Sequence, residues 1–279
     1  MKKISRRSFL AAAGLSVAAL ALTACGGSAS SVASSVASSA SSAAASTSAA
    51  AGELTTVEAG KLTMATNAAF PPYEMTTDAG DFEGIDIETA QAIADKLGLE
   101  LQIDDMDFDA ALLSVQQGKA DIVMAGVTVT DERKNVMDFS DSYATGIQSI
   151  IVPEGSDIAS PDDLAGKKIG TQRGTTGYIY CSDDFGDDAV VAYDNGLTAV
   201  QALNNGQVDA VVIDNAPAQE FVAANPGLVI LDTSYAEEDY AIGMAKGNTA
   251  LEDAVNAALE ELKADGTLQS IVDKYISAE

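Results

Sequence analysis

The sequence predicts an α/β fold with two lobes of similar architecture, and two observations lead to this prediction. From Leu54 onward, segments with strand character alternate with segments of helical spacing, as in parallel α/β units. One helix-turn-strand unit also occurs twice along the chain. Because ligands of open α/β sheets bind beyond the carboxyl ends of the strands, two such lobes would form a clamp.

The expected elements of the first lobe can be placed from local patterns. Apolar residues recur at helical spacing from Ile87 to Leu97, and Gly98 is a natural helix cap. Apolar residues then alternate over 99–103, as in a strand. The other expected elements are a strand at Lys61–Thr66 that leads into a turn at Pro71 and Pro72, a helix at Asp109–Gln117 closed by Gly118, and a buried strand at Asp121–Ala125.

The repeated unit pairs Val115–Gly126 with Leu203–Asp214. In both copies a helix ends at a glycine, an aspartate opens a strand, and the strand stops at a special residue. The two last residues, Gly126 and Asp214, are therefore expected to face one another across the cleft of the clamp.

The first 25 residues predict an export signal. Residues 1–7 are basic, and residues 9–24 form an apolar run that is short for a membrane span. Residues 5–10 resemble the twin-arginine export motif, but paired arginines also occur in ordinary secretory signals, so the export route stays open. Residues 22–25 resemble a bacterial lipobox, in which Cys25 takes a diacylglycerol and becomes the mature N-terminus. The alternative is an ordinary cysteine in a cleaved signal.

A disordered linker is expected at residues 26–53. Its composition is almost wholly Ser, Ala, Gly and Val, without aromatic residues. Such a segment cannot bury enough apolar surface to offset the entropy lost on ordering. It would tether the folded part to the membrane.

Composition excludes several classes of function. The chain has 15 basic and 42 acidic residues, a formal charge of −27, and four of the basic residues precede Cys25. So acidic a protein repels phosphate backbones, and nucleic-acid binding is not expected. The absence of histidine removes Ser-His-Asp and Cys-His catalysis and every His-ligated metal site. With Cys25 lipidated, Cys181 is left as a free thiol and no disulfide can form within the folded part.

From about Lys61 to the C-terminus, the sequence resembles the polar amino-acid-binding family of ABC-transporter solute receptors, which are periplasmic-binding-protein-like. Each matching segment is short, but their order and spacing are specific: Ala65–Glu74, Gly84–Ile87, Met106–Phe108, Ala125–Arg133, Asp138–Asp141, Gly170–Thr176, Asp209–Asp214 and Lys263–Gly266. The resemblance implies a two-lobed clamp with two linking hinge strands, near Ala144–Ile150 and Glu238–Gly243. It places the first lobe at residues 54–146 plus 243–279 and the second at 147–242.

The chemistry of an amino acid assigns roles to several residues. Arg133 has a rigid donor fork that suits the ligand's carboxylate, and Asp214 can accept its ammonium group. Gly126 permits close approach of the backbone through Thr128, and Thr175 and Thr176 begin a helix whose N-terminus favours an anion. Phe70 and Phe108 can enclose the ligand's side chain. The resemblance places binding contacts at these positions and adds further ones at Asn67, Ala125 and Gln172.

Each assignment has a structural alternative. Arg133 lies in a run of charged residues, and Asp214 precedes a turn that contains Pro217. The two phenylalanines suit a plain core, and Asn67 and Gln172 suit turns at strand ends. Structural roles are expected for Glu74 and Asp86, while Tyr73 and Tyr143 are left open between cleft rim and core. Neither acidic cluster, at 104–107 or at 183–188, has the spacing of a calcium loop, and no metal or cofactor is expected.

The expected function is a monomeric, extracytoplasmic receptor, anchored to the membrane by its lipid, that delivers an L-amino acid to an ABC permease without turnover. An amide at Asn67 favours a neutral polar ligand such as glutamine, with cystine or a cationic amino acid as alternatives. Two other functions are weighed. One is an enzyme on the same fold, similar to cyclohexadienyl dehydratase, and the other is a ligand sensor that acts through a separate membrane partner. The sequence does not distinguish a Gram-positive from a Gram-negative envelope, nor identify the permease.

Overall fold

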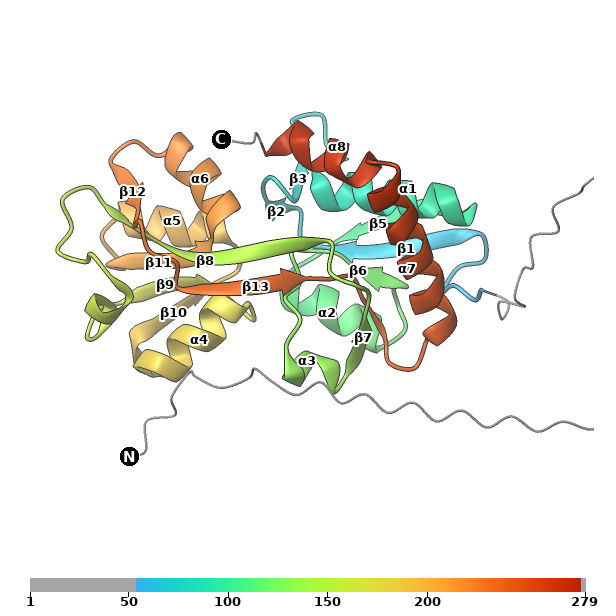
Figure 1. Cartoon of the computed structure of the whole chain (residues 1–279). Helices are drawn as coiled ribbons and strands as arrows, with labels where there is room; N and C mark the ends of the chain where they lie inside the picture. Colours follow the sequence, from blue (N-terminus) through green and yellow to red (C-terminus); the bar gives the residue numbers. More distant parts are fainter. Residues whose placement is uncertain (1–53, 277–279) are drawn as a thin grey trace, which may run out of the picture. The chain divides into compact units, whose positions relative to one another are not determined.

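The computed structural model describes residues 54–276, so the predicted signal, Cys25 and the linker lie outside the described residues. Two main sheets organise this part of the chain (Figure 1). We call the part built on the sheet β5-β1-β6-β14-β7 the first lobe and the part built on the sheet β10-β9-β11-β8-β12 the second lobe. The two-lobed α/β prediction is therefore confirmed.

The first lobe has a central parallel strand flanked by two others. Strand β1 (Lys61–Thr66) pairs in parallel with β5 (Glu100–Asp105) and β6 (Ile122–Val123), and β14 (Gly243–Ala245) joins β6 to β7 (Met137–Phe139) in antiparallel pairs. Helices α1 (Ile85–Leu97), α7 (Thr249–Ala264) and α8 (Thr267–Tyr275) pack on one another, while α2 (Phe108–Gln116) packs on β1 and β14. A short helix α3 (Asp131–Lys134) precedes β7, and a small sheet contains β2 (Ala69–Phe70), β3 (Glu74–Thr76) and β4 (Phe82–Glu83).

The second lobe repeats the parallel arrangement. Strand β9 (Ile169–Gln172) pairs in parallel with β10 (Val190–Tyr193) and β11 (Ala210–Asp214). Long strand β8 (Ala144–Pro153) runs antiparallel to β11, β12 (Leu228–Ile230) and β13 (Ala236–Tyr240). The helices are α4 (Thr176–Phe185), α5 (Gly196–Asn204) and α6 (Asn215–Ala224), with single 3₁₀ turns at Pro161–Leu164 and Asp187–Ala189. Apolar side chains of α5 and α6 belong to a buried cluster that also contains residues of the first lobe, and those of α4 belong to a separate cluster.

The local predictions agree with the helices and strands observed. The strand predicted at Lys61–Thr66 has those bounds, and the helix predicted from Ile87 begins two residues earlier. Gly98 caps that helix in the left-handed conformation, with φ 69°. The buried strand predicted at Asp121–Ala125 is shorter, because only Ile122 and Val123 pair with neighbours.

The repeated unit has the same hydrogen bonds in both lobes. In the first lobe, the N–H of Asp121 donates to the carbonyl of Thr63 (2.9 Å), and its carboxylate accepts from the N–H of Thr63 (2.8 Å). In the second lobe, Asp209 makes both bonds to Lys168 (2.8 Å each). Each aspartate thus ties the beginning of its own strand to the adjacent parallel strand. The carboxyl ends of these two strands are therefore aligned with each other.

Two strands carry the chain between the lobes (Figure 1). The chain leaves the first sheet after β7 and enters β8, and it returns through β13 to β14. The two strands pair over Ala144–Gln148 and Ala236–Tyr240. The segment Val127–Val129 of the first lobe is tied to this pair, since the N–H of Val129 donates to the carbonyl of Asp239 (3.0 Å). The precise lobe limits given above stay a prediction.

Candidate functional site

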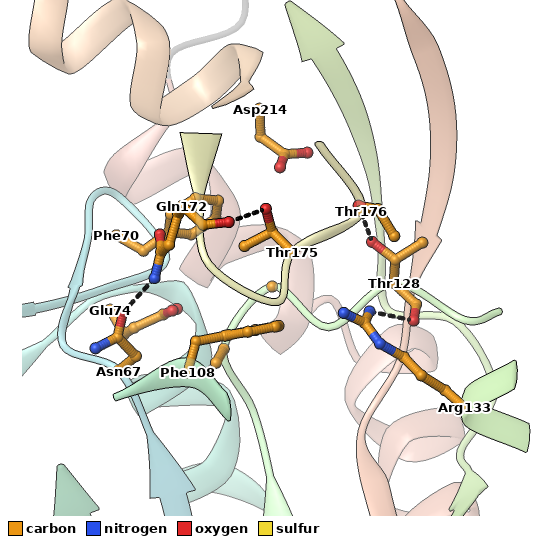
Figure 2. Close-up of a pocket in the computed structure, with 12 residues that line it drawn as sticks. Asn67, Phe70, Glu74, Phe108, Thr128, Arg133, Gln172, Thr175, Thr176 and Asp214 are labelled. Carbon is orange, nitrogen blue, oxygen red and sulfur yellow. Dashed lines mark hydrogen bonds between the residues drawn. The ribbon is translucent and has the colours of Figure 1, made fainter. Parts of the chain in front are cut away.

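One pocket of about 300 Å³ gathers residues from both lobes (Figure 2). All eleven predicted binding residues line it, together with Glu74, and the full set is Asn67, Phe70, Glu74, Phe108, Ala125, Gly126, Thr128, Arg133, Gln172, Thr175, Thr176 and Asp214. Sequence reasoning therefore located the pocket, whereas the binding role of each residue is a proposal developed below.

Arg133 is held by the first lobe with its guanidinium in the pocket. The residue is buried, and the hydroxyl of Thr130, the N-cap of α3, accepts from its backbone N–H (3.1 Å). Its Nη1 donates to the carbonyl of Thr128 (2.8 Å), and its Cζ lies 5.4 Å from the ring centroid of Phe108. Burial lowers the pKa of Arg133, but a guanidinium keeps its charge in proteins. The side chain is therefore a fixed, desolvated cation and not a member of a solvated charged run.

The second lobe contributes the N-terminus of α4. Thr175 is the N-cap of this helix, and its hydroxyl donates to the carbonyl of Gln172 (2.8 Å). Thr176, the first helical residue, is buried. The unpaired N–H groups and the dipole at a helix start favour negative charge, so this helix start and Arg133 together suit an anionic group.

Three hydrogen bonds join the two lobes directly through residues at the pocket. The amide of Gln172 donates to Oδ1 of Asn67 (2.8 Å), and Nη2 of Arg133 donates to the carbonyl of Gly174 (3.1 Å). The hydroxyls of Thr128 and Thr176 lie 3.3 Å apart. The side chains that surround the pocket therefore also hold its two walls together (Figure 2).

Asp214 supplies a carboxylate from the end of β11. It is only 7% exposed, and Nε2 of Gln148 donates to its Oδ2 (2.7 Å). Its Oδ1 makes no hydrogen bond of ordinary geometry within residues 54–276, and the buried hydroxyl of Tyr240 faces the carboxylate. Burial raises the pKa of Asp214 to about 7. An unpaired oxygen on a buried carboxylate is a natural acceptor for an ammonium group.

Phe70 and Phe108 line the pocket and are almost fully buried, so each residue belongs both to the core and to the pocket wall. Gly126 is required beside Phe70 for a steric reason. A Cβ at Gly126 would lie 2.8 Å from Cε1 of Phe70, and the φ of 54° is left-handed. The N–H of Gly126 donates to Oδ2 of Asp86 (3.0 Å). Gly126 therefore contributes space to the pocket.

Glu74 is the pocket residue that sequence reasoning missed. It was expected to be structural, yet it lines the pocket and is fully buried. Among the described residues its carboxyl group faces Asp86, which accepts a hydrogen bond from the protonated form of Glu74. Burial, followed by the charge of Asp86, raises its pKa well above the ordinary value. The only sequence signal for a place in the pocket is the position of Glu74 at the end of the Ala65–Glu74 segment. Asp86 itself keeps the expected structural role through Gly126.

Two α/β lobes joined by two strands, with a charged pocket between them, define a ligand-binding clamp. The chain belongs to the bacterial extracellular solute-binding proteins, family 3, which match residues 62–278. Membership makes it a solute-binding protein of an extracytoplasmic type. Within residues 54–276, no helix combines the length and apolar character needed to cross a membrane, and no cluster of three or more metal-ligating side chains is formed there.

Its relatives bind amino acids. The chain is 33% identical over 275 residues to a probable histidine-binding protein of Neisseria gonorrhoeae, covering 96% of this chain and 95% of the relative. It is 42% identical to an ancestral arginine-binding protein bound to glutamine (TM-score 0.75, covering 78% of this chain and 99% of that one). A structure titled as an ancestral arginine-binding protein bound to arginine is 43% identical (TM-score 0.74, with the same coverage).

Proposed function

We propose that the protein is an extracytoplasmic receptor that binds one L-amino acid without turnover and delivers it to an ABC permease. The observation that carries this proposal is the placement of Arg133 and Asp214 in one pocket, on different lobes. A guanidinium and a carboxylate in this arrangement match the carboxylate and ammonium ends of a zwitterion. Lobe closure would then bring both contacts to the ligand at once. A lipid on Cys25, with residues 26–53 as a tether, would keep the receptor at the membrane as a monomer.

The pocket bears on which amino acid is bound. The prediction of a neutral polar ligand such as glutamine depends on the amide of Asn67, but that amide donates to the carbonyl of Met106 (2.9 Å) and accepts from Gln172. Glu74, by contrast, brings a second buried carboxyl group, besides that of Asp214, to the pocket wall. We therefore favour a cationic amino acid such as arginine and keep glutamine as the second candidate. The related structures bound to arginine and to glutamine make both ligands suitable probes.

Isothermal titration calorimetry with L-arginine, L-glutamine, L-histidine and L-cystine tests the proposal. Saturable 1:1 binding of one of them is expected, and mass spectrometry should recover the ligand unchanged. Arg133→Lys should weaken binding by about tenfold or more, since a lysine cannot make the bidentate contact. A failure of all common amino acids to bind or to raise the melting temperature would refute the receptor proposal.

Glu74→Gln separates the two candidate ligands. This substitution keeps the shape and removes the charge, so arginine affinity should fall by roughly tenfold or more while glutamine affinity changes little. Because the pKa of Glu74 is raised, a cationic side chain must displace its proton. Arginine binding near neutral pH should therefore release a proton, measurable as a dependence of the binding heat on buffer ionisation enthalpy. Equal losses for both ligands, without proton release, would exclude Glu74 as the side-chain receptor.

A further inference from the structure

Two buried residues outside the pocket lining connect its opposite ends. Gln148 is on β8 and Glu238 is on β13, so each of the two strands between the lobes carries one of them. Gln148 is 1% exposed and Glu238 is 6% exposed. Both are polar side chains at positions where apolar ones would pack at lower desolvation cost, which calls for an explanation.

The strand register brings these side chains to Asp214. Gln148 lies opposite Asp214 on one side and opposite Ala236 on the other, and Glu238 is two residues from Ala236 on the same face of β13. The single amide nitrogen of Gln148 donates to Oδ2 of Asp214 (2.7 Å) and to Oε2 of Glu238 (3.0 Å). One amide group thus fixes two buried carboxylates.

The same oxygen of Glu238 continues the chain to the other end of the pocket. The hydroxyl of Thr128 donates to Oε2 of Glu238 (3.1 Å), and the carbonyl of Thr128 accepts from Nη1 of Arg133 (2.8 Å). A threonine hydroxyl has one proton. Because Thr128 gives that proton to Glu238, Thr176 must be the donor in the contact between the two threonine hydroxyls. A hydrogen-bonded path therefore runs from Asp214 through both linking strands to Arg133 and to the start of α4.

We infer that Gln148 and Glu238 are positioning residues that set the orientation of the ammonium acceptor Asp214 and of Thr128 beneath Arg133, so that the hinge strands themselves determine affinity for the ligand. This inference rests on the proposed function. Neither residue touches the ligand; each acts through a pocket residue. The two influence Asp214 in opposite ways, since Gln148 donates a hydrogen bond to its carboxylate and Glu238 places a second negative charge nearby.

That opposition provides the test. Asp214 must be ionised to accept an ammonium group, and its raised pKa predicts that the glutamine affinity of the wild-type protein increases with pH until about 7 and then levels off. Arginine affinity would also contain the displacement of the Glu74 proton, which is the same in the wild-type protein and in the variants below. Besides Glu238, the ionisable groups that face Asp214 are Tyr73, Glu74 and Tyr240, with Glu220 exposed on α6. All of these are unchanged in the variants below, so their contribution cancels in the comparison.

The experiment measures the dissociation constant between pH 5.5 and 8.5 by calorimetry, using whichever of L-arginine and L-glutamine the wild-type protein binds. Gln148→Met removes the donor to Asp214. It should weaken binding at pH 7.5 by roughly tenfold or more and move the midpoint of the pH profile upward. Glu238→Gln removes the neighbouring charge and should move that midpoint downward by at least about half a pH unit. Glu237→Gln, with the same change on the exposed neighbour, should leave the profile where it was.

Structural damage alone would weaken binding evenly over the whole pH range. An unshifted midpoint in Glu238→Gln, or shifts of both variants in the same direction, would overturn the inference. If Gln148→Met does not fold, as judged by circular dichroism, Glu238→Gln decides alone. Absence of binding by the wild-type protein to any amino acid would instead refute the proposed function, so the two failures are distinguishable.

Discussion

The two copies of the repeated unit share a scaffold and differ in what they present at its end. Asp121 and Asp209 brace the adjacent strand with the same pair of hydrogen bonds. The strand segment that follows each aspartate leads to Gly126 in the first lobe and to Asp214 in the second. Gly126 provides space against Phe70, and Asp214 provides charge. The shared architecture therefore fixes where the ends of the two strands lie, while the residue at each end fixes the chemistry offered there.

The largest expected effect comes from removing the charge of Asp214 in the second lobe. Asp214→Asn keeps the shape and the contact with Gln148, but it cannot pair with an ammonium group. Affinity for the bound amino acid should fall by about a hundredfold or more, which calorimetry can measure. The melting temperature of the ligand-free protein should stay equal or rise, because a buried carboxyl is lost. An affinity close to that of the wild-type protein would contradict the role of Asp214.

Filling the space at Gly126 in the first lobe should have the next largest effect. In Gly126→Ala the new Cβ lies 2.8 Å from Phe70 and 3.2 Å from Tyr240, at a left-handed φ. We expect a loss of about 1 kcal/mol or more in the free energy of unfolding and a loss of affinity of about tenfold. Urea unfolding and calorimetry on the same sample would measure both. An unchanged affinity would contradict the prediction and would mean that Phe70 does not contact the ligand.

Substitution of Asp121 or Asp209, the two aspartates that brace a neighbouring strand, should lower stability and leave ligand affinity nearly unchanged. Asp121 is buried and also accepts from the N–H of Val57 (2.7 Å), whereas Asp209 is exposed. Asp121→Ala should therefore lower the free energy of unfolding by about 2 kcal/mol and Asp209→Ala by less than about 1 kcal/mol. Denaturant titrations would show the difference. Equal losses would mean that burial does not distinguish the two copies.

The smallest effect concerns the pH dependence of stability. Burial raises the pKa of Asp86 to about 6, that of Asp214 to about 7 and that of Glu74 well above its ordinary value. The folded state therefore holds more protons than the unfolded state between about pH 4 and 7, and stability falls as pH rises through this window. The Glu74→Gln variant should lose less stability between pH 5 and 8 than the wild-type protein, by on the order of 1 kcal/mol. Parallel curves for the two proteins would exclude a buried, protonated Glu74.

Sequence patterns predicted the fold and the pocket well because they depend on local rules. Helical spacing, glycine caps and the repeated unit define the strand ends, and the family motifs place residues at those ends. Glu74 was not predicted as a pocket residue, because its burial and its place on the pocket wall are properties of the packed interior. The hydrogen bond between Gly126 and Asp86 and the path through Gln148 and Glu238 escaped for a related reason. Each joins residues on different elements, and their pairing depends on register and side-chain direction.

The carboxyl group of Glu74 on the pocket wall has a practical consequence. Arg133 and Asp214, proposed to bind the carboxylate and the ammonium group, are separate from Glu74, proposed to contact the ligand's side chain. Ligand preference could therefore be changed without altering the residues that bind the zwitterion. A single substitution at Glu74 would offer a starting point for sensors tuned to charged or uncharged nutrients on a common frame.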